Sequence, residues 1–224
     1  MKKKLIINIA FLLFTSLTLA QIGINTTNPT KDLDVNGELR IRNLPYLISS
    51  EFLASDNLGN IGKYNPLLIS EISSVIASSN IDVLINTSTI VNNINLGLST
   101  TIFIPANKEA IIIIDYSVPI GVSSFTNPIG YYGITFRKNG SEEVAGSRKF
   151  SFNINENANM VTVFNHYVEN FTSSSIDRYI TYSLNGYVET HNNSSNTFRF
   201  NMWDSLGENY NWGKATLSKM VYLR

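Results

Sequence analysis

Residues 110–118 read Ala-Ile-Ile-Ile-Ile-Asp-Tyr-Ser-Val, and the first five of them carry no polar side chain. A short apolar run rich in β-branched residues predicts a strand. Because polar residues do not alternate with the apolar ones, this strand is expected to be covered on both faces. Asp115 lies inside the run and is accordingly expected to be a hydrogen-bonded aspartate in the core.

The sequence on both sides of this run is typical of an all-β protein. Apolar and polar residues alternate at 180–184 and again at 198–202, as in strands that cover a core with one face. Asn139-Gly140 predicts a two-residue hairpin turn. About nine such segments between residues 81 and 224 predict a β-sandwich or jelly-roll head.

A helical spacing interrupts this pattern at residues 67–80. Leu68, Ile69, Ile72, Val75 and Ile76 repeat at intervals of three and four residues, which predicts one short helix. A helix of roughly 15 residues is marginal by itself in water. Its apolar stripe is therefore expected to form a coiled-coil neck between copies or to pack onto the head of its own chain.

Residues 21–66 are rich in Asn, Gly, Pro and Thr and contain short apolar pieces. Asn36-Gly37 lies between alternating apolar residues and predicts a hairpin turn, and a second turn is expected at residues 56–59. Small β-units of this kind are marginally stable alone. The segment is therefore predicted to be a β-hairpin stalk that needs neighbours or copies of itself.

Residues 1–20 have the three regions of a secretory signal peptide. Lysines at positions 2–4 precede a mostly apolar stretch, and Thr18-Leu19-Ala20 supplies the small residues of a cleavage site. A transmembrane anchor is the disfavoured alternative, because the apolar stretch falls short of the ~20 residues that span a bilayer. The mature chain is expected to begin at Gln21, after Ala20, and to be exported without membrane insertion.

Charge and cysteine content exclude several classes of protein. The chain has 17 basic and 17 acidic residues, and removing the lysines at positions 2–4 leaves 14 against 17, a net charge of −3 for residues 21–224. This balance argues against nucleic-acid binding through a basic surface. The absence of cysteine excludes disulfides, thiolate metal sites and a cysteine nucleophile. No cofactor is expected.

The beginning of the mature chain resembles a known group of proteins. Gln21–Pro29, followed by Leu33–Gly37 and Arg40-Ile41, resembles the opening of many Gram-negative secreted proteins with a phage-tail-fibre-like stalk. Residues 53–61 look like a second stalk unit. The resemblance implies a stalk on a protein secreted by, or displayed on, a Gram-negative bacterium.

The head has a second resemblance, carried by pattern. It is similar to the trimeric jelly rolls of the complement and tumour-necrosis-factor type in Ile104-Pro105-Ala106, Ile114–Val118, Phe136–Gly140 and the closing strand from Gly213 to Leu223. This resemblance implies a jelly-roll fold and a homotrimer.

Candidate catalytic and metal-binding groups are few. Asp32–Gly37 matches the first six positions of a calcium loop, but Asn43 replaces the glutamate of the twelfth. His166 and His191, the only histidines, cannot form a His-x-x-x-His zinc pair and are expected at the surface or in hydrogen bonds. Glu142-Glu143 would point to opposite faces of a strand. We predict no catalytic residue and no metal site, while a Ser-His-Asp triad stays open because its members meet only in three dimensions.

Trp203, Tyr210 and Trp212 lie close together near the C-terminus, beside two asparagines. Flat aromatic faces beside amides suit sugar rings, so these three residues are the candidate ligand-binding site. Packing in the core or in a trimer interface is the alternative, since aromatic residues are enriched there too.

The function favoured by the sequence is that of a secreted, non-enzymatic homotrimer. It would present its head for adhesion or surface assembly, with a surface glycan or a cell-surface protein as partner, and three weak sites on one trimer would gain avidity. A lectin-like carbohydrate-binding module is the first alternative. A tailspike-like polysaccharide depolymerase, which needs paired acids in a cleft, is the second.

Overall fold

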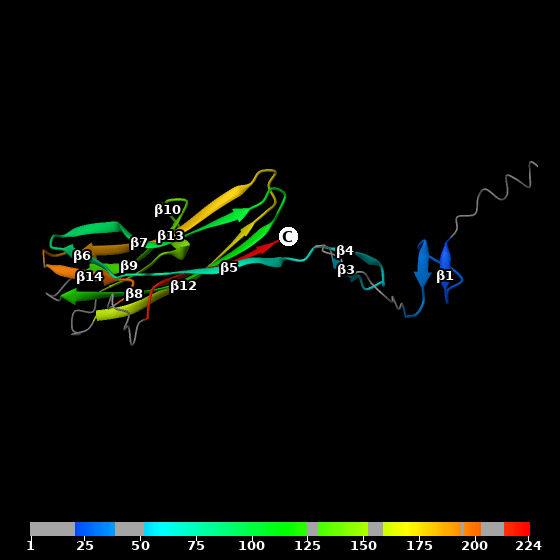
Figure 1. The fold of residues 1–224 in the computed structure, drawn as a ribbon, viewed down its shortest axis with the longest axis horizontal. Coiled ribbons are helices and arrows are strands. Elements are labelled where there is room, and N and C mark those ends of the chain that lie inside the picture. Colours follow the sequence, from blue (N-terminus) through cyan, green and yellow to red (C-terminus); the bar gives the residue numbers. More distant parts are fainter. Residues whose placement is uncertain (1–20, 39–51, 125–129, 152–158, 194, 203–212) are drawn as a thin grey trace, which may run out of the picture. The chain divides into compact units, whose positions relative to one another are not determined.

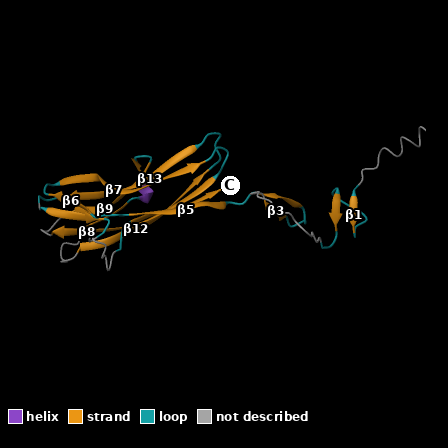
Figure 2. Ribbon diagram, viewed as in Figure 1, coloured by secondary structure: helices purple, strands orange, loops and turns teal. Residues whose placement is uncertain are grey.

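The computed structural model describes residues 21–38, 52–124, 130–151, 159–193, 195–202 and 213–224. The chain divides into two compact units, Met1–Ser50 and Glu51–Arg224. Strands dominate the described residues, whose only helical element is a single 3₁₀ turn (Figure 2). The all-β prediction is therefore confirmed. None of the described segments is a helix long and apolar enough to cross a membrane.

The first unit holds two short strands that pair in parallel, β1 (Ile22–Ile24) and β2 (Leu33–Val35). Glycine is needed at position 23 in the middle of β1, because a Cβ at this position would lie 2.6 Å from the carbonyl oxygen of Thr26. The partner of β2 among the described residues is thus β1. The second arm of the hairpin predicted at Asn36-Gly37 falls outside the described residues.

Strands β3 (Phe52–Ser55) and β4 (Ile61–Tyr64) form an antiparallel pair. The predicted turn between them is confirmed, and the Asp56 carboxylate closes it by accepting the backbone N–H groups of Leu58 and Asn60, both at 2.9 Å. Every residue of the two strands is exposed. A two-stranded pair with no covered face is marginally stable at best.

Six strands form the larger sheet, called the β8 sheet below: β5 (Leu68–Ile76), β6 (Ile81–Ile85), β8 (Ala110–Ser124), β12 (Asn159–Phe171), β14 (Asn196–Phe200) and β15 (Thr216–Leu223). One edge of the long strand β8 pairs with β12. Its other edge pairs first with β15 and then with β14. Beyond these, β5 pairs with β15 and β6 with β14. The six strands thus fill four positions across the sheet.

Five strands form the second sheet, called the β13 sheet below: β7 (Thr89–Ile104), β9 (Gly130–Lys138), β10 (Ser141–Glu142), β11 (Arg148–Ser151) and β13 (Arg178–Thr190) (Figure 1). β13 lies between β7 and β9. β10 and β11 share the other edge of β9 on either side of the 3₁₀ turn Val144–Gly146. The predicted turn at Asn139-Gly140 is confirmed, with φ of +49° and +83°.

The two sheets contribute to one hydrophobic core. The predicted alternations at 180–184 and 198–202 are confirmed, because the apolar side chains at the alternate positions of both stretches are buried. Full burial of a large apolar side chain stabilises a fold by about 1.5–3 kcal/mol. Fully buried side chains come from five strands of the two sheets: Ile102, Ile104, Ile112, Ile114, Phe136, Tyr182, Phe198 and Phe200.

The helical neck predicted at residues 67–80 is wrong, because Leu68–Ile76 is strand β5. The spacing of its apolar residues fits a helix, but four of the five are isoleucine or valine, whose branched Cβ favours strands. The edge of β15 offers β5 eight paired positions, which an isolated helix could not match. The β8 sheet therefore begins at Leu68, ahead of the predicted head boundary at residue 81.

Candidate functional site

The β8 sheet has one face on the core and one face turned away from it. Along β8, Ile112, Ile114 and Tyr116 are buried, whereas Ile111 and Ile113 are half-buried and Asp115 is exposed. Alternation along a strand puts the second set on the opposite side of the sheet. We call the side chains of β5, β15, β8 and β12 that share this side the outer face.

The core position predicted for Asp115 is wrong. The residue is exposed, since its neighbours Ile114 and Tyr116 occupy the core side and strand geometry sends Asp115 to the other. The expected cover on both faces of residues 110–114 is likewise found on only one face of the single chain.

Most of the outer face is apolar. In one cross-strand row, Ile72 of β5, Met220 of β15, Ile113 of β8 and Val168 of β12 lie side by side. Ile72 is 61% exposed and Val168 47%. Ile69, Ile76 and Phe164 extend the surface in neighbouring rows, and Phe164 is 76% exposed. Contiguous apolar surface of this kind marks an interaction site in soluble proteins.

One row of the outer face is polar across all four strands. Ser74, Ser218, Asp115 and His166 are paired in register from β5 to β12. The hydroxyl groups of Ser74 and Ser218 are 2.7 Å apart, and Nδ1 of His166 lies 2.6 Å from Oδ1 of Asp115. We call these four residues the polar row. His166 is thus at the surface and hydrogen-bonded, as the sequence predicts.

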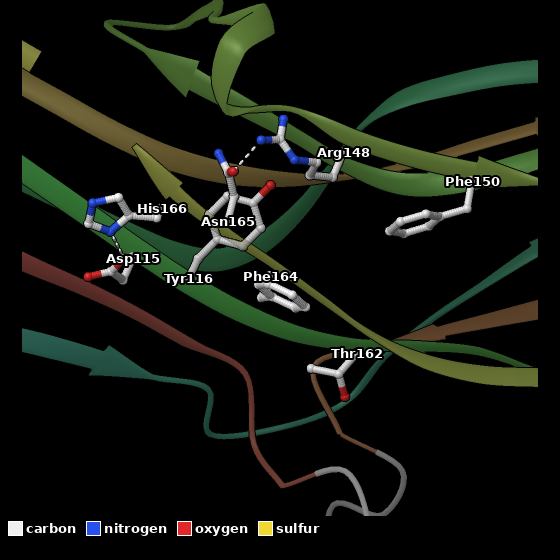
Figure 3. A pocket seen from close by; sticks show the side chains of 8 residues that line it. All are labelled: Asp115, Tyr116, Arg148, Phe150, Thr162, Phe164, Asn165 and His166. Carbon is white, nitrogen blue, oxygen red and sulfur yellow. Dashed lines mark hydrogen bonds and ion pairs between the residues drawn. The ribbon is translucent and has the colours of Figure 1, made fainter. Parts of the chain in front are cut away.

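A cavity of about 610 Å³ adjoins the β12 end of the polar row (Figure 3). In this view the Asp115–His166 pair lies apart from the Arg148–Asn165 pair, and the Phe164 ring lies below Asn165 and Tyr116 (Figure 3). Its lining combines aromatic, charged and amide side chains: Asp115, Tyr116, Arg148, Phe150, Thr162, Phe164, Asn165 and His166.

One wall of the cavity is a fixed hydrogen-bond network. The Tyr116 hydroxyl donates to the Gly146 carbonyl at 2.7 Å, and Nδ2 of Asn165 donates to the same oxygen at 3.2 Å. Arg148 donates to the Asn165 side chain and to the Ala145 carbonyl. Burial raises the pKa of the Tyr116 phenol, an effect that nearby Arg148 partly opposes, so the phenol stays a neutral donor. This wall holds the 3₁₀ turn against β8 and β12.

A second polar network lies on the core side of β12. The Glu169 carboxylate accepts hydrogen bonds from Tyr182 at 2.6 Å and Tyr167 at 3.2 Å, and it pairs with Lys138. Burial, and then the hydrogen bond to Glu169, raise the pKa of Tyr182. Sequence reasoning did not find this network, because its members come from three different strands and meet only through the pairing of those strands. Tyr167, Tyr182 and Lys138 all bond Glu169, so the network joins β9, β12 and β13.

The candidate ligand-binding residues Trp203, Tyr210 and Trp212 lie outside the described residues. The two ends of the segment that contains them are described, and they meet. The backbone N–H of Ala215 donates to the Asn201 carbonyl at 2.7 Å, and that of Asn201 to the Pro119 carbonyl at 3.0 Å. The chain therefore leaves the sheet after β14 and returns to it at the start of β15 at one point.

The other predicted groups form local contacts. Nε2 of His191 lies 3.1 Å from Glu189, and Glu142 pairs with Lys149 at 3.1 Å. Within the described part of the calcium-like segment, the Asp34 carboxylate accepts the backbone N–H of Thr30 at 2.9 Å. Over the part of the chain that the structure describes, no group of three His, Cys, Asp or Glu residues could hold a metal ion.

No protein-family model matches this chain, and the curated proteins contain no match to it. The functional inference therefore comes from the outer face, the polar row and the cavity.

Proposed function

We propose that this chain is the subunit of an exported, non-enzymatic homotrimer that presents a jelly-roll head for adhesion or surface assembly. The observation that carries the proposal is the apolar outer face of the β8 sheet. A soluble exported protein rarely leaves such a surface uncovered, and the sequence of residues 1–20 predicts export.

The strand order supports the jelly-roll part of the proposal. Counting β5/β6, β10/β11 and β14/β15 as one position each gives eight positions in chain order. One sheet then has the order 1-8-3-6 and the other 2-7-4-5. Two four-position sheets in which the first and last positions pair suit an eight-stranded double-sheet jelly roll. They also agree with the resemblance of the head to trimeric jelly rolls.

Two features favour a second copy of the chain as the cover. The run Ala110–Ile114 is apolar on both sides of its strand, as in strands that are buried on both faces. The β3–β4 pair directly precedes β5 in sequence and exposes all of its residues. Association of copies offers a cover for both surfaces, which one small ligand could not provide.

A glycan-binding role is the second candidate, and the cavity favours it. Phe150 and Phe164 line the cavity together with Asp115 and His166. Aromatic rings can pack against sugar rings, and the carboxylate and imidazole could form hydrogen bonds with sugar hydroxyls. Replacement of Phe164 by alanine should then abolish binding to a glycan array and leave the melting temperature unchanged. Joint loss of binding and stability would indicate packing instead. Polysaccharide turnover that disappears on one carboxylate-to-amide change would support the depolymerase alternative.

The proposal is tested by the mass of residues 21–224 in solution. Light scattering at micromolar concentration is expected to give three times the chain mass, and a monodisperse monomer overturns the proposal. Residues 51–224 form one of the two compact units and are the matched shorter fragment. A fragment starting at residue 81 would lack β5 and expose the edge of β15, so it is unsuitable for this comparison.

A further inference from the structure

The polar row carries a polar side chain on all four strands, which neither of its two neighbouring rows does. The row on one side is Ile72, Met220, Ile113 and Val168, and the row on the other side is Ile76, Thr216, Ser117 and Phe164, with apolar residues on its two outer strands. A polar group enclosed in an apolar contact costs free energy unless it is hydrogen-bonded. Four such groups in line across four strands therefore need partners when the face is covered.

The polar row is only partly satisfied within one chain. Ser74 bonds Ser218, and Asp115 bonds His166 through one carboxylate oxygen and one ring nitrogen. A carboxylate has a second oxygen, an imidazole a second nitrogen, and each hydroxyl can both donate and accept. The side chains of Asp115 and His166 are 56% and 62% exposed. These atoms can therefore form hydrogen bonds with a neighbouring chain.

We propose that the polar row sets the register and the number of copies in the assembly. This inference rests on the proposed function, with a second copy as the occupant of the outer face. In the correct register the polar rows of neighbouring copies bond each other. A slip by one row toward the apolar row of Ile72 and Ile113 would place Asp115 and His166 against apolar side chains, and this leaves a buried charge without a partner. Apolar rows alone would tolerate several registers, whereas buried polar groups can select one.

The test compares two double variants with a control. The variants Asp115→Val with His166→Val, and Ser74→Val with Ser218→Val, each make one half of the row apolar and introduce valine, whose branched Cβ favours strands. The control replaces Glu142 and Lys149, an ion pair on the β13 sheet, by valine. Light scattering after size-exclusion chromatography gives the mass distribution of each protein, and circular dichroism checks that each one folds.

The wild-type protein and the control are expected to elute as one trimeric species. The two row variants are expected to associate still, but as two or more species of different mass. A single unchanged trimer in both row variants overturns the inference and leaves the trimer itself intact. A monomeric wild-type protein overturns the proposed function and the inference with it. If the Asp115–His166 variant fails to fold, the smaller change at Ser74 and Ser218 decides the question.

Discussion

Replacement of Ile72 by lysine tests whether the outer face is the contact between copies. Ile72 lies on the edge strand β5 and is 61% exposed in the single chain. Lysine is common on exposed edge strands, so the substitution should leave the fold of one chain intact. It removes apolar area from the proposed contact and adds a charge there.

The size of the effect follows from the exposed fraction. Full burial of an isoleucine side chain is worth about 1.5–3 kcal/mol, so covering the exposed 61% of Ile72 contributes about 1–2 kcal/mol in each copy. Three copies would lose about 3–5 kcal/mol, which lowers the association constant of the trimer roughly 10²- to 10⁴-fold. Desolvation of the lysines adds to this loss.

Ile90 provides a matched control. It lies on β7, the edge strand of the β13 sheet, and it is also 61% exposed. Sedimentation velocity across a range of micromolar concentrations should show dissociation of Ile72→Lys at concentrations where Ile90→Lys and the wild type remain trimers. Equal trimer stability in the two variants would refute the assignment of the outer face. Dissociation of Ile90→Lys alone would place the contact on the other sheet.

Three further predictions concern the single chain. A Cβ at Gly146 would lie 2.1 Å from the Phe136 ring, so Gly146→Ala should lower the free energy of unfolding in urea by about 1–3 kcal/mol; no change would mean that the 3₁₀ turn adjusts freely. Asn201 has φ of +76° and its side chain donates to a β7 carbonyl at 2.9 Å, so Asn201→Ala should cost about 1–3 kcal/mol in the same assay, and an unaltered midpoint would contradict this role. The hydrogen bond and charge of Arg199 lower the pKa of Asp82. A pKa that is lower in the folded state than in the unfolded state stabilises the protein above the unfolded pKa, and this stabilisation is lost as pH falls through the folded pKa. Asp82→Asn should therefore reduce the loss of stability at acid pH. An unchanged acid dependence would exclude the Asp82–Arg199 pair as its source.

Local pattern was sufficient to predict most of the strands. The alternation of Ile180, Tyr182 and Leu184 follows from the two-residue period of a strand with one covered face. The neck prediction failed because the apolar residues of Leu68–Ile76 follow a helical spacing, whereas the structure depends on pairing with β15, which lies more than a hundred residues further along the chain. Nothing near residue 70 in the sequence indicates that partner.

The candidate site could be predicted only in pieces. The alternation of side chains along β8 places Asp115 on the face of the sheet opposite to Ile114. Applied strictly, this alternation would have predicted an exposed carboxylate. The polar row needs the register of four strands at once, and Ser74, Asp115, His166 and Ser218 are separated by 40 or more residues. The cavity likewise depends on β11 lying near β12, which long-range packing decides.

The hydrogen bond between Ala215 and Asn201 closes the connection between β14 and β15 at the edge of β8. β14 and β15 lie along the same edge of β8, and the chain between them departs and re-enters through adjacent hydrogen-bonded residues. Each of the two strands has its own register on β8 and its own outer partner, β6 for β14 and β5 for β15, so neither register depends on the length of chain that joins them. A protein engineer could therefore test the position between Met202 and Gly213 as an insertion point for a foreign epitope and keep the buried Met202 in place.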